Sequence, residues 1–381
     1  MRITPAHANY AKFQDFLQGR KKSPEIISLP FQSQSYDLLP GRDECGPAGE
    51  DLADLEIREN RSFEYLLFTG NPGEKSKEIL FLFHGLNERA WDKYLPWAYS
   101  LWERTGKTVV LFPLAFHINR APASWSSART MTQISRERTR NQGALDSSFF
   151  NAALSSRLQE NPRRFIWSGF ESYFDVIQIM RTIRSGRHPY IHGNAEVDFF
   201  SYSIGAFLTE LLLMQNPDNF FSESKAFLFC GGSTLQAMNP VSRYILDSNA
   251  GGALMTYMLG DLQKELTLNT RLTRFFRRTW ELGMYYMSMI GFDSLKELRD
   301  NAFNALAGRL KICALKKDRV IPADAIKKTA EPAGGENSRM IDILDFPFAY
   351  SHENPFPPEG ENPETVQQGF EQVFALAEDF L

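Results

Sequence analysis

The chain reads Glu196-Val-Asp-Phe-Phe-Ser-Tyr-Ser-Ile-Gly-Ala-Phe-Leu-Thr-Glu-Leu-Leu-Leu213 at the point that decides its fold. The first residues form an apolar run typical of a buried strand, and from Ile204 onward apolar residues recur at helical spacing. Between the two patterns, Ser201-Tyr-Ser-Ile-Gly205 predicts a tight turn with Ser203 at its apex. A strand, a tight turn and an amphipathic helix in this order would hold the Ser203 hydroxyl clear of a sheet, where it could act as a nucleophile.

This turn matches the pattern G-x-S-x-G except that Ser201 replaces the first glycine. Small residues are needed two positions before and after the nucleophile, because the strained turn brings the backbone close to its neighbours. Serine is small enough to be tolerated there. The motif alone is weak, since serine and glycine are common in ordinary turns, so its interpretation depends on what accompanies it.

A second signal lies upstream, where the apolar run Glu78–Phe83 predicts a strand buried on both faces and is followed directly by His-Gly-Leu-Asn. Acyl transfer builds negative charge on a carbonyl oxygen, which backbone N–H groups can stabilise. A glycine in this loop lets the backbone approach a substrate closely. The simpler alternative is that the loop only ends a strand. We predict backbone oxyanion donors from Ile204 and from Leu86 or Asn87, with loop support from His84 and Gly85.

An acidic residue follows another predicted strand, Leu310–Leu315, within Lys316-Lys-Asp-Arg-Val320. Asp318 is the predicted acid that would orient a histidine and stabilise its charged form. The alternative is that Asp318, beside three cationic residues, forms a solvated surface ion pair. Asp345, at the end of the last predicted strand, is a reserve candidate for the same role.

His352 is the predicted base, because it is the one histidine that follows both Ser203 and Asp318 in the chain. A surface loop position is its alternative reading. His188 and His192 share the i,i+4 spacing of a helical metal pair, but the proline between them makes a helix improbable. No metal site is therefore predicted.

The chain order Ser203, Asp318, His352, preceded by His84-Gly85, resembles that of the α/β-hydrolases. The resemblance spans roughly residues 62–381, although four short segments carry most of it. It implies a serine hydrolase acting on a carboxylic ester or a related acyl bond through an acyl-enzyme, with those three residues as nucleophile, acid and base. A small-molecule acyl substrate and no cofactor are implied as well.

The rest of the chain alternates predicted strands with helical patterns, which favours an α/β fold with a mostly parallel central sheet and helices on both faces. One predicted crossover helix carries Ile166, Phe170 and Tyr173 at near-helical spacing. The predicted strands are Phe63–Leu67, Ile79–Phe83, Thr108–Phe112, Val197–Tyr202, Lys225–Cys230, Leu310–Leu315 and Met340–Leu344.

Two connections are too long for ordinary loops and suggest how the domain is divided. We expect an N-terminal arm over residues 1–60 and a hydrolase core over residues 61–237 and 308–381, with an insertion at about residues 119–163. By resemblance, residues 238–307 form an inserted helical cap. Their aromatic and methionine side chains could line an apolar pocket or simply attach the cap to the core.

Length and composition agree with one large α/β domain that carries an insertion, or with two modest domains. The chain has 381 residues, of which 43% are hydrophobic and 23% charged, with a net charge of −4. That charge does not favour nucleic-acid binding, and no stretch has the length of a membrane span. Three cysteines without a C-x-x-C spacing and an N-terminus without an apolar signal sequence predict a cytoplasmic protein.

Two further hypotheses follow from the sequence. The cationic run Arg129–Arg140 could clamp an anionic group of the substrate, although most such runs are solvated helix faces. The chain could also have kept the turn at Ser203 while serving as a non-catalytic binding or regulatory protein. The altered glycine at Ser201 and the long insertions keep this alternative open.

Overall fold

The computed structural model describes residues 23–35, 54, 56–330, 340–357 and 361–381. Its centre is an eight-stranded sheet with the spatial order β1-β2-β4-β3-β5-β6-β7-β8. β2 runs antiparallel to both of its neighbours, and the pairs from β4 to β8 are parallel. The strands are β1 Glu25–Gln32, β2 Ser62–Thr69, β3 Ser76–Phe83, β4 Thr108–Leu111, β5 Ile191–Tyr202, β6 Ala226–Phe229, β7 Leu310–Leu315 and β8 Ile341–Leu344.

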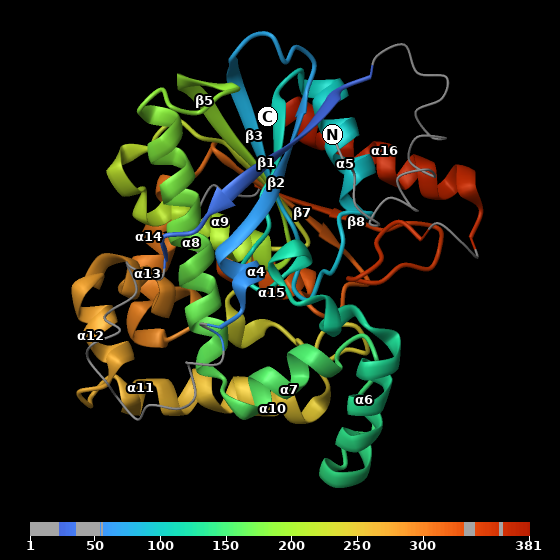
Figure 1. The fold of residues 1–381 in the computed structure, drawn as a ribbon, viewed down its shortest axis with the longest axis vertical. Helices are drawn as coiled ribbons and strands as arrows, with labels where there is room; N and C mark the ends of the chain where they lie inside the picture. The colour runs from blue at the N-terminus through green and yellow to red at the C-terminus, as the bar shows by residue number, and fades with distance from the viewer. Residues whose placement is uncertain (1–22, 36–53, 55, 331–339, 358–360) are drawn as a thin grey trace.

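Helices cover both faces of this sheet (Figure 1). The expected crossover helix is α8, which continues from the end of the first long connection to the turn before β5. None of the helices in the described part of the chain combines the length and apolar character that crossing a membrane requires. The helices are α4 Arg58–Arg61, α5 Tyr94–Thr105, α6 Ala128–Gln142, α7 Ala152–Glu160, α8 Arg163–Arg184, α9 Ile204–Gln215, α10 Ser248–Thr256, α11 Leu262–Glu265, α12 Arg271–Arg278, α13 Trp280–Ile290, α14 Lys296–Ala305, α15 Ala323–Ala330 and α16 Pro363–Phe380.

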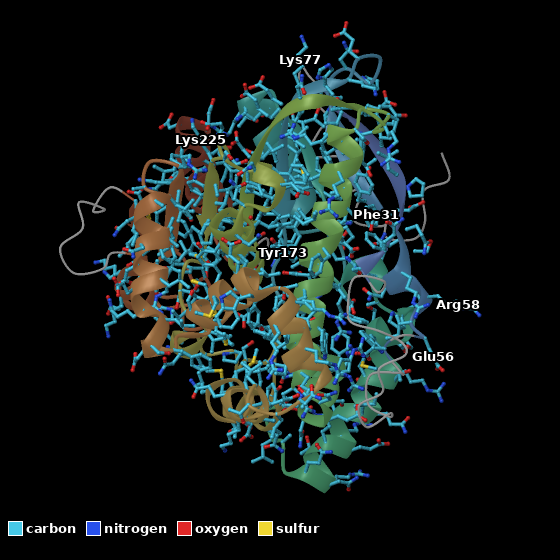
Figure 2. All side chains as sticks on the ribbon, turned by 90° about the vertical axis from the view of Figure 1, so that its left-hand side faces the viewer. Phe31, Glu56, Arg58, Lys77, Tyr173 and Lys225 are labelled. Atoms are coloured by element: carbon cyan, nitrogen blue, oxygen red, sulfur yellow. The ribbon has the colours of Figure 1, made fainter. Side chains whose placement is uncertain are left out.

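Strand β3 shows how one apolar run serves two layers. Ile79, Phe81 and Phe83 join the core cluster under α8 and α9, whereas Leu80 and Leu82 join the cluster under α5 and α16. Successive side chains of a strand point to opposite faces, so a strand covered on both sides must be apolar throughout. Figure 2 shows side chains filling the space between these layers, with charged residues such as Lys77 at the periphery. The expected α/β-hydrolase fold class, with a mostly parallel sheet and helices on both faces, is confirmed.

The expected description of residues 1–60 as an added arm was wrong for part of that range. Residues 25–32 form β1, which pairs with β2 along its whole length and makes one edge of the sheet. Pro30 lies within this strand opposite Glu64. A proline cannot donate a ladder hydrogen bond and is therefore tolerated mainly at sheet edges, which explains why the sequence pattern hides this strand.

The two long connections pack against each other at one end of the molecule. Residues 119–163 contain α6 and α7, and the connection from β6 to β7 contains α10 to α14. Arg138 on α6 forms a buried ion pair of 2.7 Å with Asp247, whose side chain also caps the N-terminus of α10. Figure 1 shows α6, α7 and α10 grouped below the sheet.

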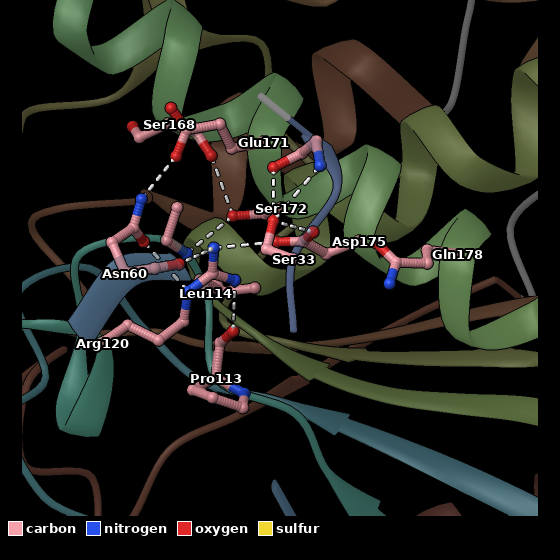
Figure 3. A network of polar contacts seen from close by, with 12 residues as sticks. Ser33, Asn60, Pro113, Leu114, Arg120, Ser168, Glu171, Ser172, Asp175 and Gln178 are labelled. Carbon is pink, nitrogen blue, oxygen red and sulfur yellow. Dashed lines mark hydrogen bonds and ion pairs between the residues drawn. The ribbon is translucent and has the colours of Figure 1, made fainter. Parts of the chain in front are cut away.

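A buried polar network fixes the segment before β2 to α8 (Figure 3). The guanidinium of Arg120 pairs with Asp175 at 2.7 Å, and both side chains are fully buried. Arg120 also donates to Asn60 Oδ1 at 3.0 Å and to the Pro113 carbonyl at 3.1 Å. Asn60 in turn donates to Glu171 at 2.7 Å. Buried charges of this kind are tolerated when they are paired and hydrogen-bonded.

Candidate active site

Ser203 occupies the turn between β5 and α9 with φ 57° and ψ −119°. Such a conformation is costly for a residue other than glycine and persists where the surroundings enforce it, often at functional sites. Gly205 explains part of the constraint, since a Cβ there would lie 2.7 Å from the Cβ of Phe83. At the other small position, Ser201 is buried and its Oγ lies 2.6 Å from Thr209 Oγ1. The serine that departs from the motif is thus accommodated with a hydrogen-bond partner.

The structure brings Ser203, His352 and Asp318 into one line of hydrogen bonds. Ser203 Oγ lies 2.7 Å from His352 Nε2, and His352 Nδ1 lies 2.7 Å from Asp318 Oδ2. All three residues are at most 5% exposed. Because an ionised carboxylate only accepts hydrogen bonds, Nδ1 of a neutral ring carries the proton and Nε2 is free to accept the serine hydrogen. This is the geometry that a serine nucleophile and its base require.

Asp318 is held by backbone donors as well as by the imidazole. Its Oδ1 accepts hydrogen bonds from the N–H groups of Val320 at 2.8 Å and Ile321 at 2.9 Å. The reserve candidate Asp345 lies elsewhere, pairing with Lys317 at 3.1 Å and accepting from Tyr350 at 2.9 Å. The carboxylate that contacts His352 is therefore Asp318. Lys317, which directly precedes it in the chain, pairs with Asp345 instead.

Tyr202, next to the serine, holds His352 in place. Its hydroxyl donates to the His352 carbonyl oxygen, and its ring stacks on the imidazole with centroids 5.4 Å apart and planes 21° from parallel. The ring and the backbone of the histidine are both restrained, which fixes the direction of Nε2. No sequence motif marks Tyr202 for this role.

The loop after β3 lies beside the serine, as the sequence predicts. Gly85 passes close to Tyr202, since a Cβ on this glycine would lie 2.8 Å from the tyrosine ring. The Gly85 N–H donates to the Tyr94 hydroxyl at 2.9 Å, and that hydroxyl donates to Glu88 at 2.7 Å. The loop is thereby tied to the start of α5.

The predicted oxyanion donors lie next to Ser203 in the chain or line the same pocket. Ile204 is the first residue of α9, where an N–H group has no partner within its own helix, and Leu86 and Asn87 line the pocket at Ser203. His84 supports the loop. Its Nδ1 lies 2.8 Å from the Gly85 carbonyl, and its Nε2 accepts from the Leu114 N–H at 2.9 Å. Burial holds the pKa of His84 well below its ordinary value, so the ring is neutral with the proton on Nδ1.

A pocket of about 430 Å³ opens at Ser203 and His352. Its apolar wall comes from both long connections, because Phe149 and Phe150 precede α7 while Tyr244 and Ile245 precede α10. The Asn87 amide fastens the two segments to the loop, donating to the Phe150 carbonyl at 2.9 Å and to the Tyr244 carbonyl at 2.6 Å. Charged residues also line this pocket: Glu88, Arg89, Asp92, Lys93 and Glu353.

The hypothesis that the cationic run clamps a substrate anion was wrong for its central residue. Arg138 is buried and engaged by Asp247 at 2.7 Å. Arg136 and Arg140 are exposed and do not line the pocket at Ser203. The run is an exposed face of α6 with Met131, Ser135 and Arg138 turned inward, as helical periodicity dictates.

The histidine pair that was set aside as a metal site is also explained. His188 is buried and its Nε2 lies 2.7 Å from the Tyr65 hydroxyl, while His192 is exposed. Of the described residues, Cys230, Asp318 and His352 have donor atoms within 4.8 Å of one another. Burial, with Asp318 as a second cause, raises the pKa of the Cys230 thiol well above its ordinary value. The sulfur is thus a protonated thiol rather than the thiolate that metal ions prefer.

Comparisons with known proteins give a family and several similar folds. The model of a family described as "Family of unknown function (DUF6051)" matches residues 7–381. No curated protein matches the sequence. A solved cold-adapted esterase from an Arctic intertidal metagenomic library is 9% identical, with a TM-score of 0.43 and coverage of 95% of this chain and 96% of that chain. Carboxyl esterase 2 of Tuber melanosporum is 10% identical, with a TM-score of 0.46 and coverage of 100% and 98%. A hyperthermophilic esterase of Pyrobaculum calidifontis is 10% identical, with a TM-score of 0.44 and coverage of 97% and 89%.

Proposed function

Because this chain belongs to DUF6051, a family whose description assigns no function, we infer its activity from its own site. We propose that it is a serine hydrolase that cleaves a carboxylic ester or a related acyl bond. The observation that carries the proposal is the pair of 2.7 Å contacts that link Ser203 through His352 to Asp318. The strained backbone of Ser203 supports it, since an ordinary turn has no need of that strain.

In the proposed reaction, Ser203 Oγ attacks the acyl carbon while His352 Nε2 takes its proton. Asp318 keeps the imidazole in the required tautomer and stabilises its charged form. The negative charge on the carbonyl oxygen is met by the backbone N–H of Ile204 and by that of Leu86 or Asn87. His352 then returns the proton to the leaving group, and a water molecule activated by the same ring hydrolyses the acyl-enzyme.

The walls of the pocket support a small-molecule acyl substrate. Phe149, Phe150 and Tyr244 offer apolar surface beside the reacting serine, as expected where a few polar groups orient a mostly apolar ligand. We assign residues 238–307 the role of a cap together with the 119–163 insertion, since both contribute to this wall. The two described cysteines are free buried thiols, which suits the reducing conditions of a cytoplasmic protein.

The non-catalytic alternative depends on Ser201 in place of glycine and on the long insertions. Ser201 is buried with Thr209 as a partner, so the turn geometry gives no reason to prefer that alternative.

Steady-state hydrolysis of short-chain nitrophenyl esters tests the proposal. Ser203→Ala should lower kcat by at least about 10³-fold, since removing a nucleophile abolishes the acyl-enzyme route. Ser185→Ala, at an exposed serine just after α8, is the matched control and should retain the wild-type rate. Equal rates for wild type and Ser203→Ala would contradict the proposal.

A further inference from the structure

The two basic side chains in the pocket at Ser203 differ in how their charge is neutralised. Lys93 pairs with Glu88 and donates to the Glu353 carbonyl at 3.2 Å. Arg89 forms no ion pair with any residue of the described part of the chain. Its Nη2 donates to the Phe150 carbonyl at 2.5 Å, whereas its Nη1 is buried and has no hydrogen-bond partner among the described residues.

An unpaired guanidinium in such a position is unfavourable in the free protein. Partial burial lowers the pKa of Arg89, as expected for a cation removed from water without a compensating carboxylate. A buried donor without a partner adds a further cost. An anionic group of a ligand would offset both, and a guanidinium is well suited to carboxylates because its N–H groups match their two oxygens.

Arg89 also lies between two adjoining pockets. It lines the pocket at Ser203 and an adjoining pocket of about 40 Å³, and the two share Leu86 and Asn87 of the predicted oxyanion loop. A ligand group held by Arg89 would therefore lie close to the site where the acyl group is proposed to react.

The smaller pocket contains a second polar atom without a partner. His117 is buried, and its Nδ1 lies 2.8 Å from the Ala115 carbonyl, while its Nε2 has no hydrogen-bond partner in the described structure. Burial lowers the pKa of His117 to about 4, so the ring is neutral, donates from Nδ1 and offers Nε2 as an acceptor. This acceptor suits a hydroxyl group or a water molecule rather than a second anion.

We propose that Arg89 binds a carboxylate carried by the substrate, so that the enzyme acts on acyl esters with a free carboxyl group, such as monoesters of short dicarboxylic acids. The inference rests on the proposed hydrolase function and narrows it to a substrate class. A carboxylate is favoured over a phosphate because Glu88, Asp92 and Glu353 line the same pocket. A single unpaired cation among these acidic groups can neutralise one negative charge more readily than two.

Two nitrophenyl esters that differ in one charge test the proposal: 4-nitrophenyl hydrogen glutarate and its methyl ester. The measured quantity is the ratio of kcat/KM for the charged ester to kcat/KM for the neutral ester. Arg89→Gln should lower this ratio roughly 10- to 100-fold, as expected for the loss of a hydrogen-bonded charge pair. Arg89→Lys should recover part of the ratio, and Arg136→Gln, at an exposed arginine of α6, should leave it at the wild-type value.

A ratio unchanged in Arg89→Gln would overturn the inference while leaving the hydrolase proposal intact, and so would a preference for a phosphate-bearing ester over the glutarate ester.

If the wild type releases nitrophenol from neither ester, binding of glutarate to Ser203→Ala is measured by calorimetry. Binding that weakens at least tenfold on adding Arg89→Gln would support the carboxylate site without hydrolysis. No binding to either variant would overturn it. Thermal unfolding of every variant excludes loss of the fold.

Discussion

Asp318 and Asp175 are both buried carboxylates that contact a basic side chain, but their surroundings differ. Asp318 contacts His352, whose other ring nitrogen reaches Ser203 at the wall of a pocket. Asp175 contacts Arg120, whose remaining donors are directed at Asn60 and a backbone carbonyl (Figure 3). One cluster thus ends in an atom that a ligand can reach, and the other is occupied by protein groups. Burial and pairing alone therefore do not identify a functional site, whereas a reactive atom that a ligand can reach does.

The largest effect is expected from Asp318→Asn, which alters the carboxylate that contacts His352. An asparagine at this position can hold the imidazole in the wrong tautomer, and a loss of about 10⁴-fold in kcat is expected by analogy with serine proteases. The measurement is steady-state ester hydrolysis. Asp345→Asn is the matched control, with less than about a threefold change, because Asp345 contacts Lys317 and Tyr350 at the surface. The reverse ranking of the two variants would give the role to Asp345.

Arg120→Met should destabilise the buried cluster around Asp175. It leaves Asp175 buried without its partner, so the free energy of unfolding should fall by about 3–5 kcal/mol. Urea unfolding followed by tryptophan fluorescence measures it. Arg181→Met removes a partner of Asp218 in a pair that is about half exposed, and should cost only about 0–1 kcal/mol. Similar losses in the two variants would show that the buried network is not a major source of stability.

Glu171 gives the same network a pH dependence. Burial raises its pKa to about 8, whereas an unfolded chain has a glutamate pKa of about 4.3. The folded state therefore binds the extra proton between these values, and the stability contributed by Glu171 is fully present below about pH 4.3 and is lost as the pH rises towards 8. Glu171→Gln should remove this decline. Unfolding free energies of both proteins from pH 5 to pH 8 measure it, and parallel curves would contradict the prediction.

The smallest effect is expected from Tyr94→Phe, because Tyr94 supports the loop after β3 and takes no part in the proposed chemistry. The variant removes the hydroxyl that accepts from the Gly85 N–H, so kcat should fall roughly 3- to 10-fold through a less fixed oxyanion loop. Tyr99→Phe, on the same helix, removes a hydroxyl that donates to Glu103 instead and serves as the control. Equal rates for both variants would mean that other contacts suffice to hold the loop.

Much of the core was predictable because its signals are local. The serine at the strand-to-helix turn and the His-Gly loop after an apolar strand each occupy a few consecutive residues. Asp318 and His352 each follow a predicted strand, and their order in the chain can be read from the sequence directly. Strand β1 escaped prediction because it lies at the sheet edge and contains Pro30.

The pocket wall could not be predicted for a different reason. Phe150 and Tyr244 come from connections far apart in sequence, and their rings meet with centroids 4.9 Å apart only in the folded chain. No periodic pattern in the sequence predicts such a contact. The roles of Arg89 and Tyr94 could not be predicted either. The sequence shows that both residues lie near the predicted loop, but it does not show which groups they contact.

The most direct test of the central claim is the intact mass of the protein after exposure to a fluorophosphonate probe. An activated serine attacks phosphorus and retains the organophosphonyl group. We predict one adduct on the wild-type protein, located on Ser203 by peptide mapping, and no adduct on folded Ser203→Ala or His352→Ala. A folded wild-type protein that takes up no probe, or an adduct that persists in Ser203→Ala, would contradict the claim that Ser203 is a nucleophile activated by His352.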